Sequence, residues 1–394
     1  MAQIHWLNQV SANFNTAADW STGTVPGASD DVFLDAAGST DYTVTASTSE
    51  TVHSIKLANP ATLAISGGVF TASSVSSNAG TIAIGNGSTF ACFNDQIVNT
   101  GTIALASTGA ATTLDVSFDD ARFDGGGTIS LSGSAENTIE GPKRGFITNV
   151  DNTIVGSGSV IGLGRGTAII NEAGGVIDAD SKTALFLKLS KINNAGLIET
   201  TGKGYCMIAG VLENTGTLEA NGGLITLKYG AGGSGSVIIS AGAINSQDDF
   251  NQDVSFTGRS GKLELAKSQS YSASIAGFSL TGRTSLDLRD IAFVNSGEAT
   301  FTGTATSGVL TVTDGTHTAH INLIGDYTGA TFVTSADNHG SAMVIATGPS
   351  PTADAHRFIA AAAGLRGSAA EAIHAAAPWT GHAPMLARPH VMMA

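Results

Sequence analysis

The sequence predicts an all-β protein, a right-handed parallel β-helix in which short strands stack into a solenoid. Three observations support this fold class: a recurring Asn-x-Gly phrase, a composition rich in turn-forming and β-branched residues, and short strands with a nearly constant return distance. The right hand is expected because crossovers between parallel strands are right-handed in nearly all proteins. We also expect an N-terminal cap, an antiparallel hairpin at the far end, and a short helical or disordered tail.

The recurring phrase consists of Asn, one or two residues, Gly and a β-branched strand. It reads Asn78-Ala-Gly-Thr-Ile, Asn99-Thr-Gly-Thr-Ile, Asn171-Glu-Ala-Gly-Gly-Val-Ile, Asn194-Ala-Gly-Leu-Ile and Asn214-Thr-Gly-Thr-Leu. The steps are 21 residues from Asn78 to Asn99, 23 from Asn171 to Asn194 and 20 from Asn194 to Asn214. We place Asn and Gly in the turns because both residues tolerate positive φ. A turn and a short strand at a fixed distance indicate stacked rungs, where a rung is one circuit of the solenoid.

Composition agrees with short strands and tight turns. The 394 residues include 50 Gly, and only 13% are charged while 42% are apolar, which separates the chain from charged disordered sequences. The net charge of −14 argues against a nucleic-acid partner and against an anionic membrane surface. No stretch approaches the ~18 apolar residues of a membrane span. The acidic balance serves solubility, or else calcium binding, and calcium is the one cofactor that we consider.

The first segment, residues 1–50, is predicted to be a cap. Trp6, Phe14 and Trp20 are large apolar anchors separated by turn residues. The first rung of a solenoid exposes an apolar cross-section and unpaired strand edges, so a cover is required. Exposed aromatic residues that bind sugar are the alternative interpretation.

The second segment, residues 51–245, is predicted to hold the parallel rungs. Its strands are three to five residues long and cannot be stable alone, so stacking must bury their apolar faces. They are predicted at 63–65, 81–84, 102–105, 128–131, 160–163, 176–179, 197–199, 217–219 and 237–239.

The last two segments change in character. Residues 246–347 are predicted to finish the solenoid with antiparallel strands, and Asp314-Gly315 predicts a type I′ turn between two alternating strands. Residues 348–394 are rich in Pro and Ala, and 354–377 could form a helix with Asp354 as its N-cap. We treat this tail as a loosely attached helix or disorder that could serve as an export address.

Parallel β-helices also host polysaccharide lyases and hydrolases, which need two or three carboxylates on adjacent rungs, often with Lys or Arg. Asp178 and Asp180 would share a face if their strand continues, and Lys182 follows them, so these three are the catalytic candidates. Asp at a strand end usually serves a turn, which is the competing interpretation. Further carboxylate pairs are Asp30-Asp31, Asp119-Asp120, Asp248-Asp249 and Asp287 with Asp290.

Other polar groups give weaker signals. Asp119, Asp120 and Arg122 lie one or two rungs from Lys143-Arg144, where they form either an acidic-basic groove or solvated loop charges. His317 and His320 point to opposite faces, so a shared metal site would need His339 as well. Cys92 and Cys206 fit neither a CxxC motif nor a disulfide framework and are interpreted as small buried apolar residues. We predict no cofactor-binding residues and no metal ligands.

Three segments carry a family resemblance. The opening from Phe14 through Asp19-Trp20 and Pro26 to Asp30-Asp31 resembles the start of large β-strand-repeat proteins of Gram-negative bacteria. The Asn-x-Gly-Thr rungs resemble autotransporter passengers and filamentous adhesins. The stretch 263–319 is similar to a module of large secreted α-proteobacterial proteins. The resemblance implies a secreted or surface-attached β-helix for adhesion or matrix formation, and it carries over no catalytic residue.

These observations lead to a functional hypothesis. We expect a non-enzymatic adhesin or extracellular matrix protein, secreted or on the cell surface, whose partners are surface glycans or other copies of itself. The alternative is a β-helix polysaccharide lyase or glycoside hydrolase, so enzymatic activity stays open. A third interpretation is a truncated passenger. Residues 1–8 lack the basic and apolar regions of a Sec signal, so type I secretion is the expected route.

Overall fold

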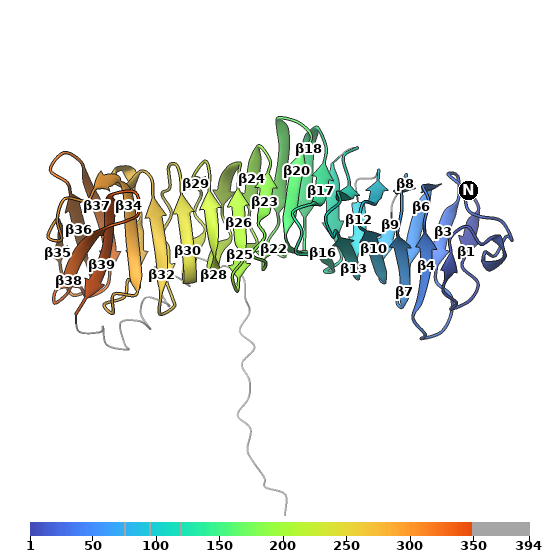
Figure 1. Ribbon diagram of the computed structural model, residues 1–394, viewed down its shortest axis with the longest axis horizontal. Helices are drawn as coiled ribbons and strands as arrows, with labels where there is room; N and C mark the ends of the chain where they lie inside the picture. Colours follow the sequence, from blue (N-terminus) through green and yellow to red (C-terminus); the bar gives the residue numbers. More distant parts are fainter. Residues whose placement is uncertain (75, 94–95, 119, 349–394) are drawn as a thin grey trace, which may run out of the picture.

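The computed structural model describes residues 1–74, 76–93, 96–118 and 120–348, which form a β-solenoid of about 12 rungs (Figure 1). Strands make up 56% of the chain and helix 2%, and consecutive rungs pair in parallel. The predicted all-β parallel solenoid is therefore confirmed. Of the predicted tail, residues 349–394 lie outside the described residues.

Each complete rung contributes strands to three faces, which the chain visits in the order A, B, C. Face A comprises β1 (Gln3–His5), β3 (Asp31–Leu34), β6 (Ser54–Leu57), β9 (Ser76–Asn78), β12 (Gln96–Asn99), β15 (Ala121–Asp124), β18 (Arg144–Asn149), β21 (Gly166–Asn171), β24 (Lys191–Asn194), β27 (Val211–Asn214) and β29 (Ala231–Gly232). We name the corners between faces A–B, B–C and C–A.

The other two faces share the long strands β28 (Thr217–Leu227) and β30 (Ser236–Ser246), which bend from face B into face C. Face B further comprises β2 (Ala12–Asn13), β4 (Tyr42–Ala46), β7 (Ala61–Ile65), β10 (Thr81–Gly85), β13 (Thr102–Ala106), β16 (Thr128–Leu131), β19 (Thr153–Gly156), β22 (Val176–Ala179), β25 (Leu197–Thr201), β31 (Val254–Phe256) and β33 (Ser274–Ala276). Face C further comprises β5 (Glu50–Val52), β8 (Val69–Ala72), β11 (Thr89–Cys92), β14 (Thr112–Asp115), β17 (Asn137–Gly141), β20 (Gly158–Gly162), β23 (Leu185–Lys188), β26 (Tyr205–Ile208), β32 (Gly261–Leu265) and β34 (Thr284–Ala292). Two short 3-10 helices, η1 (Ala17–Asp19) and η2 (Ser268–Ser270), lie in connections.

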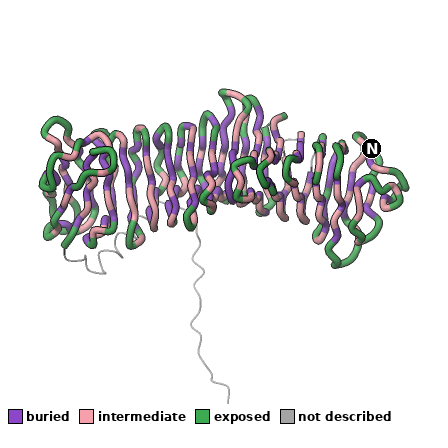
Figure 2. Tube along the Cα trace, in the orientation of Figure 1, coloured by how far each residue is buried: buried purple, intermediate pink, exposed green. Residues whose placement is uncertain are grey.

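The core is a continuous column inside the three faces, as the alternation of buried and half-buried residues in Figure 2 shows. Side chains alternate along a strand, so every second residue points inward. In β10, Ile82 and Ile84 are buried, and Ile82 is in register with Leu63 below it and Ile103 above it. Each such side chain contributes about 1.5–3 kcal/mol by burial. The β-branched strands of the sequence therefore supply both the pleat and the core.

A ladder of buried asparagine side chains runs up the A–B corner. The Nδ2 of Asn171 donates to Oδ1 of Asn194 at 2.8 Å, and Nδ2 of Asn194 donates to Oδ1 of Asn214 at 2.8 Å. The same amides also donate to backbone carbonyls of the next rung, Leu197 and Thr217, at 3.1 and 3.0 Å. Each side chain is 0–1% exposed. The ladder satisfies buried polar groups and ties neighbouring rungs together.

The ladder continues past a rung that lacks the phrase. Asn99 has Gly125 at the corresponding place above it, and Nδ2 of Asn99 instead donates to Oδ1 of Asn152 at 2.8 Å. The backbone N–H of Asn152 donates to Oδ1 of Asn149, whose Nδ2 donates to Asn171 at 2.9 Å. At the N-terminal end, Oδ1 of Asn78 has no hydrogen-bond partner. The ladder thus begins at Asn78 and bridges its own gap.

Positive φ does not explain the recurring phrase, which corrects the sequence interpretation. In the part of the chain that the structure describes, every residue with positive φ is a glycine, and the phrase glycines Gly101, Gly196 and Gly216 are not among them. A Cβ at Gly196 would instead lie far inside van der Waals contact with the carbonyl oxygens of Glu172 and Gly175. Glycine is required because the turns of successive rungs approach closely, and asparagine is required for the ladder.

The N-terminal aromatic residues are inside the protein. Trp6, Phe14 and Trp20 are 0–1% exposed, and their rings meet edge to face with centroids 4.8 and 5.0 Å apart. The Trp20 indole N–H donates to the Phe14 carbonyl at 2.7 Å. These rings fill the end of the core rather than face solvent, so the sugar-binding alternative for them is wrong. Parallel pairing already includes β1 and β3 in this region.

The C-terminal end is antiparallel. It contains the remaining strands β35 (Ala299–Gly303), β36 (Ser307–Thr313), β37 (Thr318–Ile324), β38 (Thr331–Ala336) and β39 (Ser341–Thr347). Strand β39 pairs antiparallel with β34, and β36 pairs antiparallel with β37. The Asp314 turn contains four residues rather than the predicted type I′ pair, because Asp314 keeps negative φ and its carboxylate accepts the N–H groups of Thr316 and His317 at 2.7 and 2.6 Å.

Candidate functional site

The sequence-predicted candidates are separated by the end of a strand. Asp178 lies on the outer side of β22 and accepts hydrogen bonds from the Thr201 N–H at 3.2 Å and hydroxyl at 2.9 Å. Strand β22 ends at Ala179, and Asp180 and Lys182 are exposed in the following B–C turn. Within the described residues no ion pair joins Lys182 to Asp178 or Asp180. The structure therefore does not assemble the predicted group of three.

Asp178 instead belongs to a column of carboxylates. It is in register with Glu199 on β25, which is in register with Glu219 on β28. Three carboxylates thus occupy successive rungs of face B, ~4.8 Å apart along the stack. Glu199 and Glu219 each follow the phrase asparagine by five residues. Aligned phrases therefore place both residues in one column, although they are far from Asp178 in sequence.

Two members of the carboxylate column, Asp178 and Glu199, have pKa values raised above those of free carboxylates. Partial burial raises the pKa of Glu199, and the negative charges of Asp178 and Glu219 raise it further. Partial burial also raises the pKa of Asp178, against the lowering effect of the Thr201 hydroxyl. The Ser240 hydroxyl donates to Glu219. Raised carboxyl pKa values suit a general acid, so this column has the chemistry that the enzyme hypothesis needs.

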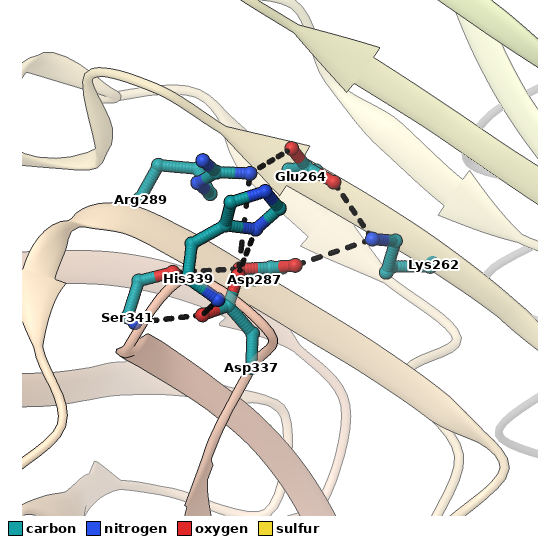
Figure 3. A network of polar contacts seen from close by, with 7 residues as sticks. All are labelled: Lys262, Glu264, Asp287, Arg289, Asp337, His339 and Ser341. Atoms are coloured by element: carbon teal, nitrogen blue, oxygen red, sulfur yellow. Dashed lines mark hydrogen bonds and ion pairs between the residues drawn. The ribbon is translucent and has the colours of Figure 1, made fainter.

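A second charged group joins the last parallel rungs to the antiparallel end. We call it the C-terminal ion network (Figure 3); it consists of Lys262, Glu264, Asp287, Arg289, Asp337, His339 and Ser341. Lys262 Nζ lies 2.7 Å from Glu264 Oε2 and 3.2 Å from Asp287 Oδ2. Arg289 lies 2.9 Å from Glu264 Oε1, and the Ser341 hydroxyl donates to Asp287 Oδ1 at 3.3 Å. All four oxygens of Glu264 and Asp287 therefore have donors.

Burial and hydrogen bonding set the charge states in this network. Asp287 is 2% exposed, and burial raises its pKa even though Lys262 opposes the shift. Burial would also raise the pKa of Asp337, but the N–H groups of Ser341 and His339 and the His339 ring hold it well below its usual range. The Asp337 carboxylate accepts these N–H groups at 2.7 and 2.8 Å. The network anchors the loop before β39 onto β34.

The other predicted carboxylates have local partners. Asp31 contacts His53 and Ser54, and Asp30 accepts the Gly27 N–H. Asp248 and Asp249 share Lys267, whereas Asp290 accepts hydrogen bonds from Ser268 and Gln269 and is not joined to Asp287. Among the described residues no group of three or more His, Cys, Asp or Glu is placed to hold a metal ion. Calcium binding therefore stays a prediction without an assigned site.

The structure separates Arg122 from Lys143-Arg144, which favours solvated charges over an acidic-basic groove. Asp119 lies outside the described residues, and Asp120 accepts the Phe146 N–H at 2.7 Å beside Arg144. Arg122 lies on face A, where it contacts Asp124 and Glu172. Arg144 and its neighbour Lys143 are exposed at the C–A corner.

The three histidines near the C-terminal end do not share a site, and both cysteines are buried. His317 contacts Asp314, His320 contacts Thr311, and His339 contacts Asp337, so the three histidines have separate partners. Burial raises the pKa of Cys92 to about 11 and that of Cys206 to about 12. Both cysteines are thus the small buried apolar residues that the sequence predicts.

Comparison of the chain with protein-family models, curated proteins and solved structures finds no match. Within the described residues, no helix has both the length and the apolar character needed to span a membrane. The function must therefore be argued from the faces and corners of the solenoid.

Proposed function

We propose that this protein is a non-enzymatic β-solenoid that is secreted or displayed on a cell surface and acts through its extended faces, as an adhesin or matrix component. The observation that carries the proposal is a column of identical side chains on face B. Six successive rungs present threonine at the same outward position: Thr43, Thr62, Thr81, Thr102, Thr128 and Thr153.

The neighbouring outward column is also small and uncharged. In the same rungs it contains Thr45, Ala64, Ala83, Ala104, Ser130 and Val155, and all twelve residues of the two columns are half-buried. The hydroxyl groups recur at the strand spacing of ~4.8 Å, and β-branched side chains lose little freedom on binding because χ1 is already restricted. Such a surface can accept sugar hydroxyls of a neutral glycan or pack against the same face of another copy.

Binding and self-association test this proposal together. The Thr81→Lys/Thr102→Lys double variant places two charges on face B, while Ser77→Lys/Val98→Lys places two charges on face A of adjacent rungs. We expect the face B variant to weaken retention on immobilised neutral polysaccharide or on cells, or to weaken self-association in sedimentation velocity, by about tenfold. We expect the face A control to change neither. Wild-type protein that shows none of these interactions would contradict the proposal.

An enzyme acting on extracellular glycans is the second candidate, favoured by two observations. The carboxylate column puts Asp178, Glu199 and Glu219 on adjacent rungs, and the C-terminal ion network puts Lys262 between two carboxylates. The network carboxylates already have donors on every oxygen, so the column is the better place for catalysis. A degradation screen with calcium present, repeated with Glu199→Gln, tests this candidate. Products that disappear in the variant would establish the enzyme.

A further inference from the structure

The C–A corner differs from the rest of this acidic molecule because unpaired cations gather there. Over five successive rungs it presents six exposed basic side chains: Lys143, Arg144, Arg165, Lys188, Lys191 and Lys228. Among the described residues none of these six forms an ion pair with a carboxylate, whereas Arg122, Lys262, Lys267 and Arg289 all do. Six of the 18 Lys and Arg residues thus lie along one edge of a chain whose net charge is −14.

Exposed apolar side chains lie along the same edge. Phe146, Leu163, Val211 and Tyr229 are 43–54% exposed, and they lie among the six cations in the turns and strand ends of this corner. We call the cations and these apolar residues together the corner ridge. In Figure 1 the turns beside the labels β18 and β20 stand above those of neighbouring rungs, and Figure 2 shows them exposed. Exposed aromatic and apolar groups interleaved with cations indicate a binding surface.

The ridge contains a hollow of about 460 Å³ that is lined by four successive rungs. Its lining includes Arg165, Lys188, Ser190, Val211 and Tyr229. The Ser190 hydroxyl donates to the Arg165 carbonyl at 2.6 Å and so joins two of the rungs. The Lys188 Nζ lies 4.5 Å from the centroid of the Phe186 ring and donates to the Ser159 hydroxyl at 3.5 Å, and its partners among the described residues include no carboxylate.

Two glycines let the turns that line this hollow stack closely. A Cβ at Gly164 would lie far inside van der Waals contact with the Lys143 carbonyl, and a Cβ at Gly210 would do the same with the Leu189 carbonyl. Both glycines line the hollow. Close stacking of the turns therefore excludes a larger residue at each position, and the backbone forms part of the lining.

We propose that the corner ridge binds a linear acidic polysaccharide, with one sugar ring in the hollow against Tyr229 and its carboxylate or sulfate on Arg165 and Lys188. This ligand class rests on the proposed function as a surface-binding protein. Guanidinium and ammonium groups form charge-assisted hydrogen bonds with such anions, and an aromatic ring gives an apolar face for the sugar. The remaining cations recur along the stack, so a chain that follows the corner meets further positive charges.

The charge density of the ridge favours an acidic polysaccharide over duplex nucleic acid. Six cations over five rungs spaced ~4.8 Å apart give about one charge per 4 Å, whereas duplex DNA carries one phosphate charge per ~1.7 Å of axis. The nearest carboxylates bound the ridge: Asp120 at one end, Asp248 and Asp249 at the other, and Glu213 on face A and Glu140 on face C. A dense polyanion would meet these carboxylates, whereas a chain with widely spaced anions would fit between them.

Charge reversal at the ridge tests the proposal with a matched control. The ridge variant is Arg165→Glu/Lys188→Glu; the control is Lys182→Glu/Lys203→Glu, which makes the same charge change in exposed B–C turns of nearby rungs. Binding to polygalacturonate, dextran, duplex DNA and phosphatidylserine vesicles is measured at low and moderate salt. We expect wild type to bind polygalacturonate, the ridge variant to bind it at least about tenfold more weakly, and the control to change little.

Tyr229→Ala should weaken polygalacturonate binding several-fold without a change in net charge.

Several results would overturn the ridge proposal. Equal losses in the ridge variant and the control would show diffuse electrostatics, and tighter binding of DNA or vesicles than of polygalacturonate would assign the ridge to another ligand. If polygalacturonate does not bind, but neutral glycan binding or self-association depends on Thr81 and Thr102, the ridge proposal is overturned and the proposed function stands. Absence of all glycan binding and of self-association would overturn both.

Discussion

The parallel stack and the antiparallel C-terminal end solve the same problem, that of buried polar groups, in opposite ways. In the stack, neutral Asn171, Asn194 and Asn214 each donate to the next rung and accept from the previous one. In the C-terminal end, charged Glu264 and Asp287 are enclosed by Lys262, Arg289 and Ser341. Each ladder amide donates to a rung that follows it, until the ladder ends on Gln252, whereas the carboxylates of the ion network are all enclosed by local donors. An open ladder lets rungs repeat, and a closed network with an antiparallel strand ends them.

Breaking the closed network should have the largest effect. Glu264→Gln removes the charge that the half-buried cations Lys262 and Arg289 share, and hydrogen bonds to charged groups contribute about 1.5–3 kcal/mol each. Hydrogen exchange of β34 and β39 should accelerate strongly while that of β10 and β13 stays unchanged. The control Arg122→Gln removes a partly exposed pair and should cost less than about 1 kcal/mol. Unchanged exchange in β39 would show that the network does not hold the end in place.

Removal of one ladder member should have the next largest effect. Asn194→Ala takes the donor from Asn214 Oδ1 and an acceptor from Asn171, which should cost about 2–3 kcal/mol in free energy of unfolding. Asn78→Ala at the start of the ladder removes a side chain whose Oδ1 already lacks a partner, so its cost should be smaller. Urea unfolding of both variants measures the difference. Equal costs at the two positions would contradict the directional ladder.

A glycine substitution tests whether close approach fixes the spacing of the stack. Gly196→Ala forces a Cβ against the Glu172 and Gly175 carbonyls, and such overpacking should cost about 1–3 kcal/mol. Gly133→Ala is the control, because a Cβ there meets only Ser181 Oγ at 3.6 Å and φ is not positive. Thermal unfolding should separate the two variants. A stable Gly196→Ala protein would mean that neighbouring rungs can move apart.

The carboxylate column gives the smallest effect and a pH signature. The pKa of Glu199 is higher in the folded protein than its ordinary value of 4.5. Glu199 therefore favours folding at a pH below 4.5, and this contribution is lost as the pH rises through the raised pKa. Glu199→Gln should therefore stabilise the protein at pH 7 by about 0.2–1 kcal/mol and have no stabilising effect below pH 4. Thermal melts across this pH range provide the measurement. If Glu199→Gln destabilises the protein at pH 7, Glu199 makes a favourable contact that is stronger than its repulsion by Asp178 and Glu219.

The fold could be predicted from the sequence because its determinants repeat. Asn78, Asn99, Asn194 and Asn214 mark equivalent corners, and β-branched residues alternate in each strand after them. The physical reason for the phrase could not be predicted, because ladder hydrogen bonds and turn-to-turn contacts join residues about 20 positions apart. Only the stacked rungs show that Gly196 lies against neighbouring carbonyl groups and does not have positive φ.

The candidate sites were less accessible from the sequence. Asp178 was found, but Glu199 and Glu219 were missed because they are close to it only across rungs. The ion network joins Asp287 to Ser341 and Arg289 to Asp337 across the antiparallel pair of β34 and β39, whose register has no repeat to reveal it. The basic side of the C–A corner was visible only at Lys143-Arg144, because the other cations are separated by whole rungs. Repetition predicts the scaffold well, but it predicts sites only where the repeats are aligned.

The most direct test of a surface-binding, non-enzymatic solenoid is size-exclusion chromatography with light scattering on mixtures of the protein with polygalacturonate or dextran, with calcium present. One run reports both co-elution of the protein with the polysaccharide and the molar mass of the polysaccharide after incubation. The account predicts co-elution with at least one polysaccharide and an unchanged polysaccharide mass. A falling polysaccharide mass that Glu199→Gln abolishes would contradict it.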